Sequence, residues 1–418
     1  MIFIPDSSVL ILKFKENFSK VKSCDKFFIL SIFLFPVSLI AGPAVMEIIM
    51  FLNIILFIFK FNEFKYFIDK NLIKIFLLIY FIIILSSLLS DFKLHSLKSS
   101  IFLIRFFIFY FIIYSILIKY NFIIKYLGYF YLFIIIFLIS DLFIQVIFKK
   151  NIFFIERQSP TIYAGFFGEE KVLASFIIRI TPIALSLILW SNNIKSKYYL
   201  ILSLLIFIFL SLFFTGERTG FIYFFILLFC TLYILQQEKI LNLSKMILLL
   251  LILCAIISGV AFSNKYKFTQ TVKHTYNQIY FDKKLRFYSI KHQAYAETSL
   301  LIFKDNLFLG GGPNNYRYLY KKYDIDQNLS NHPHNFFIQC LGDLGLSGLF
   351  IYIYILSLLI KLFFNSLYKK KYYLVFLCLS LFFYINPFFP SGNLFNNWFM
   401  GVGSLSFPFI FVFLKEKK

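Results

Sequence analysis

Apolar runs follow one another along almost the whole of this 418-residue chain, with short polar connections between them. A run of about 18 or more apolar residues is long enough to cross a bilayer as an α-helix. A bilayer admits only helices or closed barrels, and these runs lack strand-like alternation. The pattern therefore predicts an all-α polytopic membrane protein with about 12 transmembrane helices. The predicted spans are residues 27–43, 44–59, 72–90, 99–118, 126–148, 172–190, 198–214, 219–236, 245–263, 336–360, 372–389 and 394–414.

One polar connection is far longer than the others. Residues 264–333 separate the ninth predicted span from the tenth. The chain is therefore expected to have three parts. These are residues 1–263 with the first nine helices, the loop 264–333, and residues 334–418 with the last three helices and a tail.

Two local patterns stand out in the long loop. Phe287, Ile290, Ala294 and Leu301 recur near helical spacing, which predicts an amphipathic helix lying on the bundle. GGGPNNYR at residues 310–317 follows and predicts a turn that stops this helix. Its glycines alone are a weak indication of a phosphate-binding loop.

Lysines gather at alternate connections, for example in residues 13–26, 60–74 and 369–371. Positive residues beside short loops stay on the cytoplasmic side of a membrane. Both termini are therefore expected in the cytoplasm, and the loop 264–333 on the outer side. The net charge of +22 is explained by these lysines, so nucleic-acid binding is not expected.

Composition agrees with a membrane protein. The chain is 60% hydrophobic and has a mean hydropathy of +0.81, which excludes an ordinary soluble domain. None of the five cysteines lies in residues 264–333, and no CxxC pair occurs. The sequence therefore predicts no disulfide framework.

Three charged residues fall inside predicted spans. Arg105, Asp141 and Arg179 lie six or seven residues from the outer ends of their helices, which places them roughly 10 Å below the outer surface. Charge at that depth is costly and usually marks a partner or a pathway. Two interpretations stay open: Asp141 pairs with Arg105 or Arg179 and ties helices together, or the three line a polar cavity open to the outer side.

The stretch HNFFIQCLGDLGLSG, residues 334–348, carries His334 and Asn335, then nine residues, then Gly345-x-x-Gly348. This pattern, at the end of a large outer loop, resembles the O-antigen ligase and O-antigen polymerase superfamily. TGERTGF at 215–221, Arg286, GGGPNNYR and AGFFGEEKVLASF at 164–176 are similar to parts of that superfamily as well. The resemblance covers roughly residues 155–360.

The resemblance implies a multi-pass enzyme of the bacterial inner membrane, in which the long loop is periplasmic. Such enzymes transfer a glycan from undecaprenyl diphosphate to an acceptor hydroxyl at the periplasmic face. The acceptor is a lipid A–core sugar for a ligase and another repeat unit for a polymerase. The sequence leaves these two open, together with a protein O-oligosaccharyltransferase. No cofactor or metal is expected, and the partners are the lipid-linked glycan, its acceptor and membrane lipids.

The reaction needs a base for the acceptor hydroxyl and cations for the leaving diphosphate. His334 is the candidate base, because histidine titrates near working pH. Arg218, Arg286 and, less strongly, Arg179 are the candidates for binding the diphosphate, since a guanidinium matches phosphate oxygens. Other residues are possible contacts to sugar or acceptor, namely Glu169, Glu170 and Asn335.

Each of these residues also has a structural interpretation. His334 could only cap the helix, Arg218 could pair with Glu217, and Arg286 could be one of several solvated cations. His332 is interpreted as local structure, because a His-x-His pair without a third ligand at motif spacing is a weak zinc signal.

The residues after His334 also carry a pattern. Gly342, Gly345 and Gly348 are expected to form a small-residue strip for close helix contact, with Asp343 in a structural role.

A transporter or flippase of polysaccharides is the main alternative function. Transporters often show two related halves with a site at the midplane. Here no repeat is visible, the loop divides the spans nine and three, and the charged residues lie near one surface. These features favour an enzyme. A non-catalytic assembly protein is a third interpretation.

Overall fold

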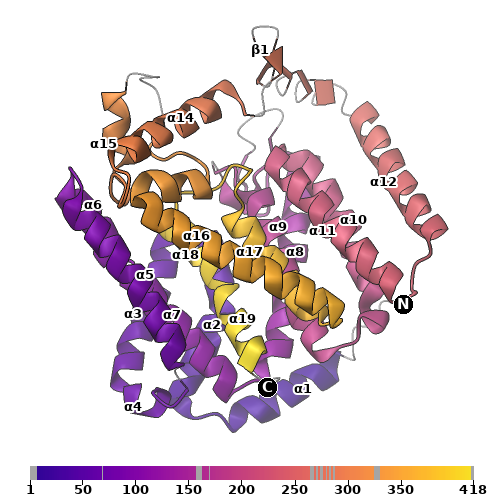
Figure 1. The fold of residues 1–418 in the computed structure, drawn as a ribbon. Helices are drawn as coiled ribbons and strands as arrows, with labels where there is room; N and C mark the ends of the chain where they lie inside the picture. The colour runs from indigo at the N-terminus through magenta and orange to yellow at the C-terminus, as the bar shows by residue number, and fades with distance from the viewer. Residues whose placement is uncertain are drawn as a thin grey trace. The chain divides into compact units, whose positions relative to one another are not determined.

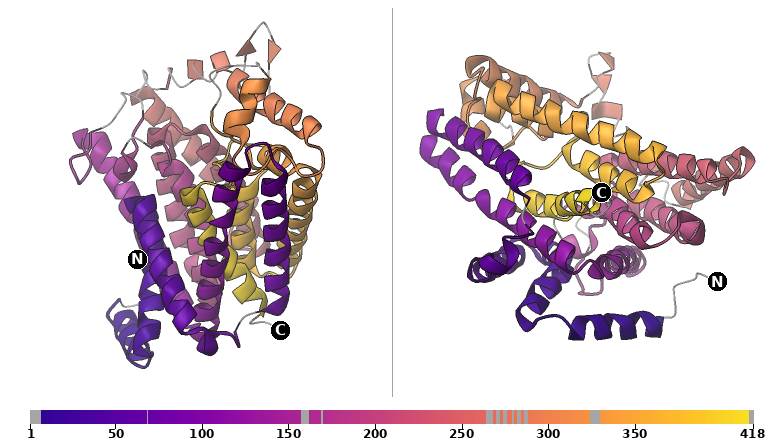
Figure 2. Two further views of the ribbon diagram at one scale, coloured as in Figure 1. Left: turned by 90° about the vertical axis from the view of Figure 1, so that its left-hand side faces the viewer. Right: turned by 60° about the horizontal axis from the view of Figure 1, so that its bottom comes forward.

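The computed structural model describes residues 7–67, 69–156, 162–168, 170–263, 288–323 and 330–415, with the short pieces 268–269, 272–273, 276–278, 280–281 and 284–285 between them. The described chain is almost entirely helical (Figures 1 and 2). Glu169 and Arg286, both predicted site residues, and Phe287 of the predicted loop helix lie outside the described residues.

The chain forms two units that interleave along the sequence. The first comprises Met1–Val21, Phe122–Asn277 and Ser366–Ser380, and the second comprises Lys22–Asn121, Gln278–Asn365 and Leu381–Lys418. The predicted division at residues 263 and 333 follows membrane topology, and it stays a prediction.

The first unit centres on α9, Leu173–Ser191, whose side chains from Leu173 to Leu189 are mostly buried. It packs against α8, Ile123–Phe148, and also contacts α10 and α11. The remaining elements are α1 (Ser7–Ser19), η1 (Gly165–Phe167), α10 (Ile194–Thr215), α11 (Arg218–Gln237), α12 (Leu243–Ser263) and most of α17 (Tyr372–Ile385).

The second unit holds the other described elements. In chain order they are α2 (Ser23–Ala41), α3 (Pro43–Phe59), α4 (Phe61–Phe64), α5 (Lys70–Leu89), α6 (Lys93–Ile101), α7 (Ile104–Lys119), β1 (Tyr280–Phe281), β2 (Lys284–Leu285), α14 (Ile290–Asp305), α15 (Tyr316–Leu319), η2 (Tyr320–Lys322), most of α16 (Phe336–Tyr368), α18 (Asn397–Ser404) and α19 (Phe407–Lys415). The two short strands pair in antiparallel fashion.

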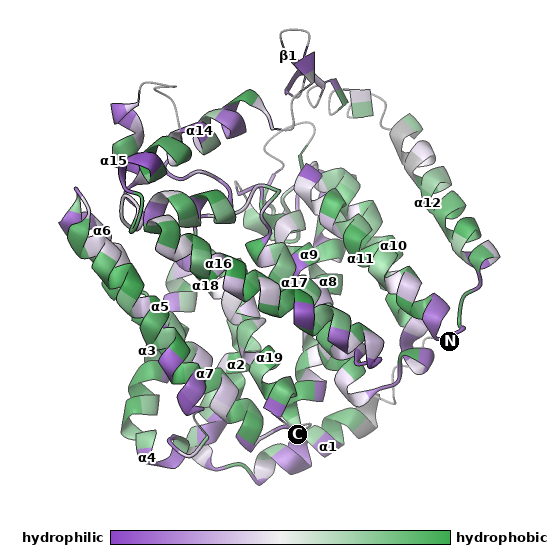
Figure 3. Ribbon diagram, viewed as in Figure 1, coloured by the Kyte–Doolittle hydropathy of each residue, from purple (hydrophilic) through white to green (hydrophobic). Residues whose placement is uncertain are grey.

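Among the described residues, nine helical segments are long and apolar enough to cross a membrane, and Figure 3 shows hydrophobic residues along most of the helices. The nine are Ser23–Ala41, Lys70–Leu89, Lys93–Lys119, Ile123–Phe148, Leu173–Ser191, Ile194–Thr215, Arg218–Gln237, Phe336–Tyr368 and Asn397–Lys415. Shorter apolar helices are Pro43–Phe59, Leu243–Ile256 and Tyr372–Ile385. The predicted all-α polytopic membrane fold is confirmed, and the count of twelve spans stays a prediction.

The predicted loop helix is present as α14. Its N-cap is Ser289, whose side chain accepts a hydrogen bond from the amide of His292. Ala294, Tyr295 and Ile302 are buried on one face, while Ile290 is exposed. The amphipathic pattern therefore identified the helix but not its buried face, because Ala294 is the only described residue of the pattern that is buried and Leu301 is half-buried.

A kink divides α16 at Gly345, which has φ 63° and ψ −148°. The kink interrupts the hydrogen bonds within α16, and the backbone of residues 307–312 forms hydrogen bonds with the amides and carbonyls that are left. The amides of Gly311 and Gly312 donate to the carbonyls of Gly342 and Asp343 at 2.8 and 3.1 Å. In return, the amides of residues 346 and 347 donate to the carbonyls of residues 307 and 308 at 2.8 and 3.1 Å. The segment GGGPNNYR is therefore more than a helix stop, because its glycines pair with the broken helix.

The glycine strip expected on α16 is only partly correct. A Cβ on Gly342 would lie 2.3 Å from Ser299 Oγ of α14, so this glycine does permit close helix contact. Gly345 is not helical, and its closest neighbours are the backbone atoms of residues 307–310. The prediction failed there because residue spacing alone does not reveal a kink that a distant loop stabilises.

Candidate functional site

His334 lies just before α16, in the second unit. Its φ of 51° is in the left-handed region, and its carbonyl accepts a hydrogen bond from the amide of Ser391 at 2.8 Å. Its Nε2 lies 2.9 Å from Ser330 Oγ, and its ring packs 5.2 Å from the ring of Tyr295. Burial, and then the charge of His292, lower the pKa of His334 to about 4. The imidazole is therefore neutral at pH 7 and able to accept a proton.

Asn335 starts the helix. Its Oδ1 accepts from the amide of Ile338 at 3.0 Å, and its Nδ2 donates to the carbonyl of Pro387 at 2.9 Å. Both polar groups of this buried amide are thus used within the chain, in the way expected of an N-cap residue.

His332 stacks on His334, with ring centroids 3.9 Å apart. Its Nδ1 lies 2.8 Å from Asn331 Oδ1, while its Nε2 is buried and has no hydrogen-bond partner among the described residues. Burial, followed by the charges of His334 and Arg317, lowers the pKa of His332 to about 3. This histidine belongs to a buried polar cluster, which its sequence interpretation as local structure did not anticipate.

Asn314, with φ 63°, connects several segments of the second unit. Its Oδ1 accepts from Arg317 at 2.9 Å and from Asn393 Nδ2 at 3.1 Å. Its Nδ2 lies 3.1 Å from Ser99 Oγ and 3.4 Å from His95 Nε2 on α6. One side chain of the GGGPNNYR segment therefore joins α6, α15 and the stretch before α18.

A second set of hydrogen bonds runs through the first turns of α16. Gln339 Nε2 donates to Asp343 Oδ2 at 3.0 Å and to Asn393 Oδ1 at 2.7 Å. The backbone amide of Asn314 approaches Asp343 Oδ2 at 3.4 Å. Asp343 is buried, and its hydrogen bonds with Gln339 and the amide of Asn314 agree with the structural role expected for it.

Arg317 stands at the edge of this cluster and was not singled out by the sequence. One terminal nitrogen donates to Asn314, and its Nε is buried without a hydrogen-bond partner among the described residues. The only sequence signal was its place at the end of GGGPNNYR. His95, some 220 residues earlier, had no signal at all, because only folding brings it to Asn314.

The first unit holds the other candidates. Arg218 is the first residue of α11 and is exposed, and Glu170 is exposed just before α9. Glu217, considered above as a partner of Arg218, accepts from the backbone amides of Ala174 and Ser175 at 2.9 and 3.1 Å. Burial raises the pKa of Glu217 to about 7, although these two amides oppose the shift. Glu217 thus caps the N-terminus of α9.

Arg179 is buried on α9 and bonds to the carbonyl and hydroxyl oxygens of Ser175 on its own helix. Its guanidinium also lies over the ring of Tyr223, 5.4 Å from the centroid. Asp141 instead accepts from the amide of Ile152 at 2.9 Å. The expected pairing of Arg179 with Asp141 is therefore wrong.

Arg105 has a different carboxylate partner, in the second unit. Its guanidinium binds Glu47 through two hydrogen bonds of 2.9 and 2.8 Å and also contacts Asn397 Oδ1 at 2.8 Å. This two-point pair ties α3, α7 and α18 together. The interpretation in which Arg105 pairs with Asp141 is therefore wrong, because its acid is Glu47.

The candidates thus fall into two groups. His334 and Asn335 lie in the second unit, and Arg179, Arg218 and Glu170 lie in the first. Among the described residues, no group of three or more His, Cys, Asp or Glu side chains is arranged to hold a metal ion.

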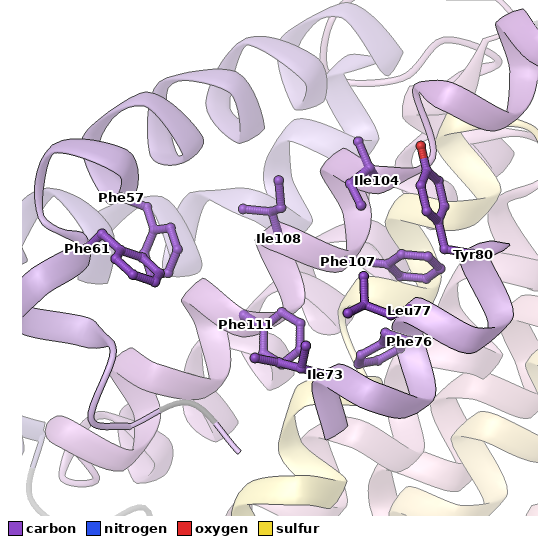
Figure 4. Close-up of a pocket in the computed structure, with 10 residues that line it drawn as sticks. All are labelled: Phe57, Phe61, Ile73, Phe76, Leu77, Tyr80, Ile104, Phe107, Ile108 and Phe111. Carbon is purple, nitrogen blue, oxygen red and sulfur yellow. The ribbon is translucent and has the colours of Figure 1, made fainter. Parts of the chain in front are cut away.

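Two apolar cavities lie within the second unit. One, of about 140 Å³, follows α16 and is lined by residues that include Phe336, Cys340 and Leu344, together with Leu394 beside Asn393. The other, of about 220 Å³, lies among α3, α4, α5 and α7 (Figure 4). Phe76 and Phe107 line both cavities, so the two are neighbours.

These features define a multi-pass helical membrane protein with a half-buried histidine–arginine cluster next to the apolar cavity along α16. Residues 201–353, from α10 to α16, match the family described as O-antigen ligase, and this match supports the resemblance to the O-antigen ligase and polymerase superfamily. The match includes Arg218, Arg286 and His334, whereas Glu170 and Arg179 precede it. No curated protein matches the chain. The family supports glycosyl transfer of the O-antigen ligase or polymerase type, with a lipid-linked glycan and an acceptor as substrates.

Proposed function

We propose that the protein transfers a glycan from undecaprenyl diphosphate to an acceptor hydroxyl at the periplasmic face of the bacterial inner membrane. The observation that carries the proposal is the position of His334, just before α16 and inside the matched family region. Its lowered pKa keeps the imidazole neutral at pH 7. In this proposal both termini are cytoplasmic. The acceptor is lipid A–core or a growing glycan.

In the proposed reaction, His334 accepts the proton of the acceptor hydroxyl as that oxygen attacks the anomeric carbon of the first sugar. The new carbon–oxygen bond replaces the bond to the diphosphate, which leaves with the electron pair. Arg218 and Arg286, with Arg179 as a weaker candidate, bind the diphosphate and stabilise its charge. Glu169 and Glu170 are candidates for contacts with sugar or acceptor, whereas both polar groups of the Asn335 side chain are already hydrogen-bonded within the chain.

The apolar cavities support an amphiphilic donor. Phe336 follows Asn335 directly in the chain, and Leu394 follows Asn393, so the cavity along α16 begins beside the polar cluster. A lipid-linked glycan has the same arrangement of a polar head and an apolar tail. Ligand sites of this kind are mostly apolar, with a few polar groups that fix orientation. We infer that the cavity along α16, of about 140 Å³, receives a short part of the isoprenoid chain next to the diphosphate.

The test is a His334→Ala variant expressed in a strain that lacks the gene, analysed by lipopolysaccharide gels and by a lipid-linked glycan assay. Long chains that stay on undecaprenyl diphosphate and never reach lipid A–core identify a ligase. Single repeat units that reach the core without a ladder identify a polymerase. The amount of protein in the membrane, measured in parallel, separates loss of catalysis from loss of folding.

The same variant separates transfer from transport. If glycans still cross the membrane while transfer stops, the transporter alternative fails. If His334→Ala restores the normal glycan pattern, the assignment of His334 as base is refuted. Because the pKa of His334 is about 4, the transfer rate is expected to stay level from pH 7 to about 5. The rate is expected to fall near pH 4, because protonation of His334 removes the base.

A further inference from the structure

Arg317 is a half-buried cation that acts on the carboxyl of Asp343 through its charge but forms no ion pair with it. Within the described part of the chain it forms no ion pair, and its recorded side-chain hydrogen bond goes to the neutral amide of Asn314. Its buried Nε lacks a partner there as well. A guanidinium that is withdrawn from water and only partly hydrogen-bonded is costly, so it tends to bind an anion.

His332 also has a buried nitrogen, Nε2, without a hydrogen-bond partner among the described residues. Burial, then the charges of His334 and Arg317, lower the pKa of His332, and the backbone of Ser391 opposes this shift. A connected path joins the two side chains: Arg317 bonds Asn314, and Asn314 bonds Asn393 at 3.1 Å. Two residues before Asn393, the amide of Ser391 donates a hydrogen bond to the carbonyl of His334. The ring of His334 in turn lies against the ring of His332, with centroids 3.9 Å apart.

The obvious internal anion is already engaged. Asp343 is buried nearby, but its Oδ2 accepts from Gln339 at 3.0 Å and is approached by the amide of Asn314 at 3.4 Å. It therefore stabilises the loop around Asn314 and leaves the Nε of Arg317 without a partner. An added oxygen ligand would supply the missing hydrogen bond.

We propose that Arg317 and His332 form an oxyanion site, and that the oxyanion is a phosphate of the lipid-linked donor. Arg317 supplies charge and a planar set of donors suited to phosphate oxygens, and His332 supplies a hydrogen bond from Nε2 in the tautomer that carries its proton there. The site rests on the proposed function for the identity of its ligand. It adds a cation from the GGGPNNYR segment to those expected from the family motifs.

The test measures binding of inorganic diphosphate and of undecaprenyl diphosphate to the full chain in lipid nanodiscs. Arg317→Gln is expected to weaken both at least tenfold, which corresponds to about 1.4 kcal/mol. Lys321→Gln removes an exposed cation from the same segment and is the matched control, with affinities within twofold of the wild type. Arg317→Lys keeps the charge and is expected to recover part of the affinity.

Each outcome has a distinct meaning. If Arg317→Gln, with an unchanged thermal midpoint, binds both ligands like the wild type, the oxyanion site is refuted. If the variant loses inorganic diphosphate but keeps the lipid diphosphate, the site binds a free anion and the assignment to the donor is refuted. If Arg317→Gln does not fold, Arg317→Lys and His332→Phe carry the test, and wild-type affinity in both would refute the site.

A transfer assay separates this proposal from the proposed function. If the wild type transfers glycan, His334→Ala does not, and Arg317→Gln keeps the wild-type KM for donor, only the oxyanion site fails. If the wild type binds diphosphate through Arg317 but transfers no glycan, only the proposed function fails. A raised KM with a smaller change in kcat is the expected result for a residue that binds the donor.

Discussion

Replacing Gly345 by alanine is expected to destabilise the protein strongly. Gly345 has φ 63° and ψ −148°, a backbone conformation that is essentially restricted to glycine. A Cβ at this position would lie 2.6 Å from the amide nitrogen of Gly310 and 2.7 Å from the carbonyl oxygen of Leu307. Both are backbone atoms, so no side chain can rotate away to make room.

The magnitude follows from two contributions. The unfavourable backbone conformation costs an alanine about 1–3 kcal/mol. To relieve the overlap, residues 307–310 must move away from the kink, which lengthens the backbone hydrogen bonds that join the two segments. Losing two of the four bonds at about 1 kcal/mol each adds about 2 kcal/mol. The expected loss is therefore about 3–5 kcal/mol, a large part of the stability of a typical protein.

The measurement is the thermal midpoint of the purified protein in one detergent, together with glycan transfer. Gly259→Ala is the matched control, because a Cβ on Gly259 in α12 would meet no atom within 4 Å. In a helix this exchange is expected to leave stability unchanged or to raise it by about 0.5–1 kcal/mol. If Gly345→Ala keeps the wild-type midpoint and transfer rate, the kink is not required and the reasoning fails.

Two further predictions concern Glu217 and the cavity along α16. The pKa of Glu217 is about 7 in the folded protein and near 4.5 in the unfolded chain, so the folded state holds an extra proton between these values. The free energy of unfolding is therefore expected to fall as pH rises from about 4.5 to 7. The Glu217→Gln variant is expected to lack this fall. If the thermal midpoints of the wild type and the variant change with pH in parallel, the prediction is wrong. Ile355 lines the cavity of about 140 Å³, and Ile355→Trp would fill part of it. If the larger side chain excludes two methylene groups of the donor's tail, at about 0.8 kcal/mol each, the transfer rate with a long-chain donor is expected to fall roughly tenfold. Ile353→Trp, on the exposed face, is the control, and equal rates with short-chain and long-chain donors in both variants would refute the cavity as the tail site.

Hydropathy predicted the helical class and most of the spans because burial in lipid imposes long apolar runs. The break between the first two predicted spans is present, with α2 ending at Ala41 and α3 starting at Pro43. Predicted span 99–118 is instead α6 and α7, which meet near residue 102, and span 394–414 is α18 and α19. Apolar periodicity continues through such interruptions, so a hydropathy pattern does not locate them.

The sequence motif pointed to His334 but did not predict the side chains that surround it. His334, Asn335 and Gly345 follow one another at fixed spacing, and a local pattern can carry that information. His95 and Asn393 reach Asn314 from positions more than 75 residues away, and no local pattern encodes those contacts. The sequence therefore predicted a candidate residue, His334, and the fold shows which side chains surround it.

The kink at Gly345 links the family motif to the rest of the chain. Ser86 of α5 places its hydroxyl 2.6 Å from the carbonyl of Leu309 and 3.0 Å from that of Asp343, so it contacts both α16 just before the kink and the segment that pairs with the kink. Ser86 precedes the matched region 201–353, and Asn393, which bonds Gln339, follows it. The arrangement around His334 therefore depends on segments on both sides of the recognised family region. We infer that the matched region alone does not hold this geometry, because the backbone of the kink and the side chain of Gln339 take hydrogen bonds from outside it.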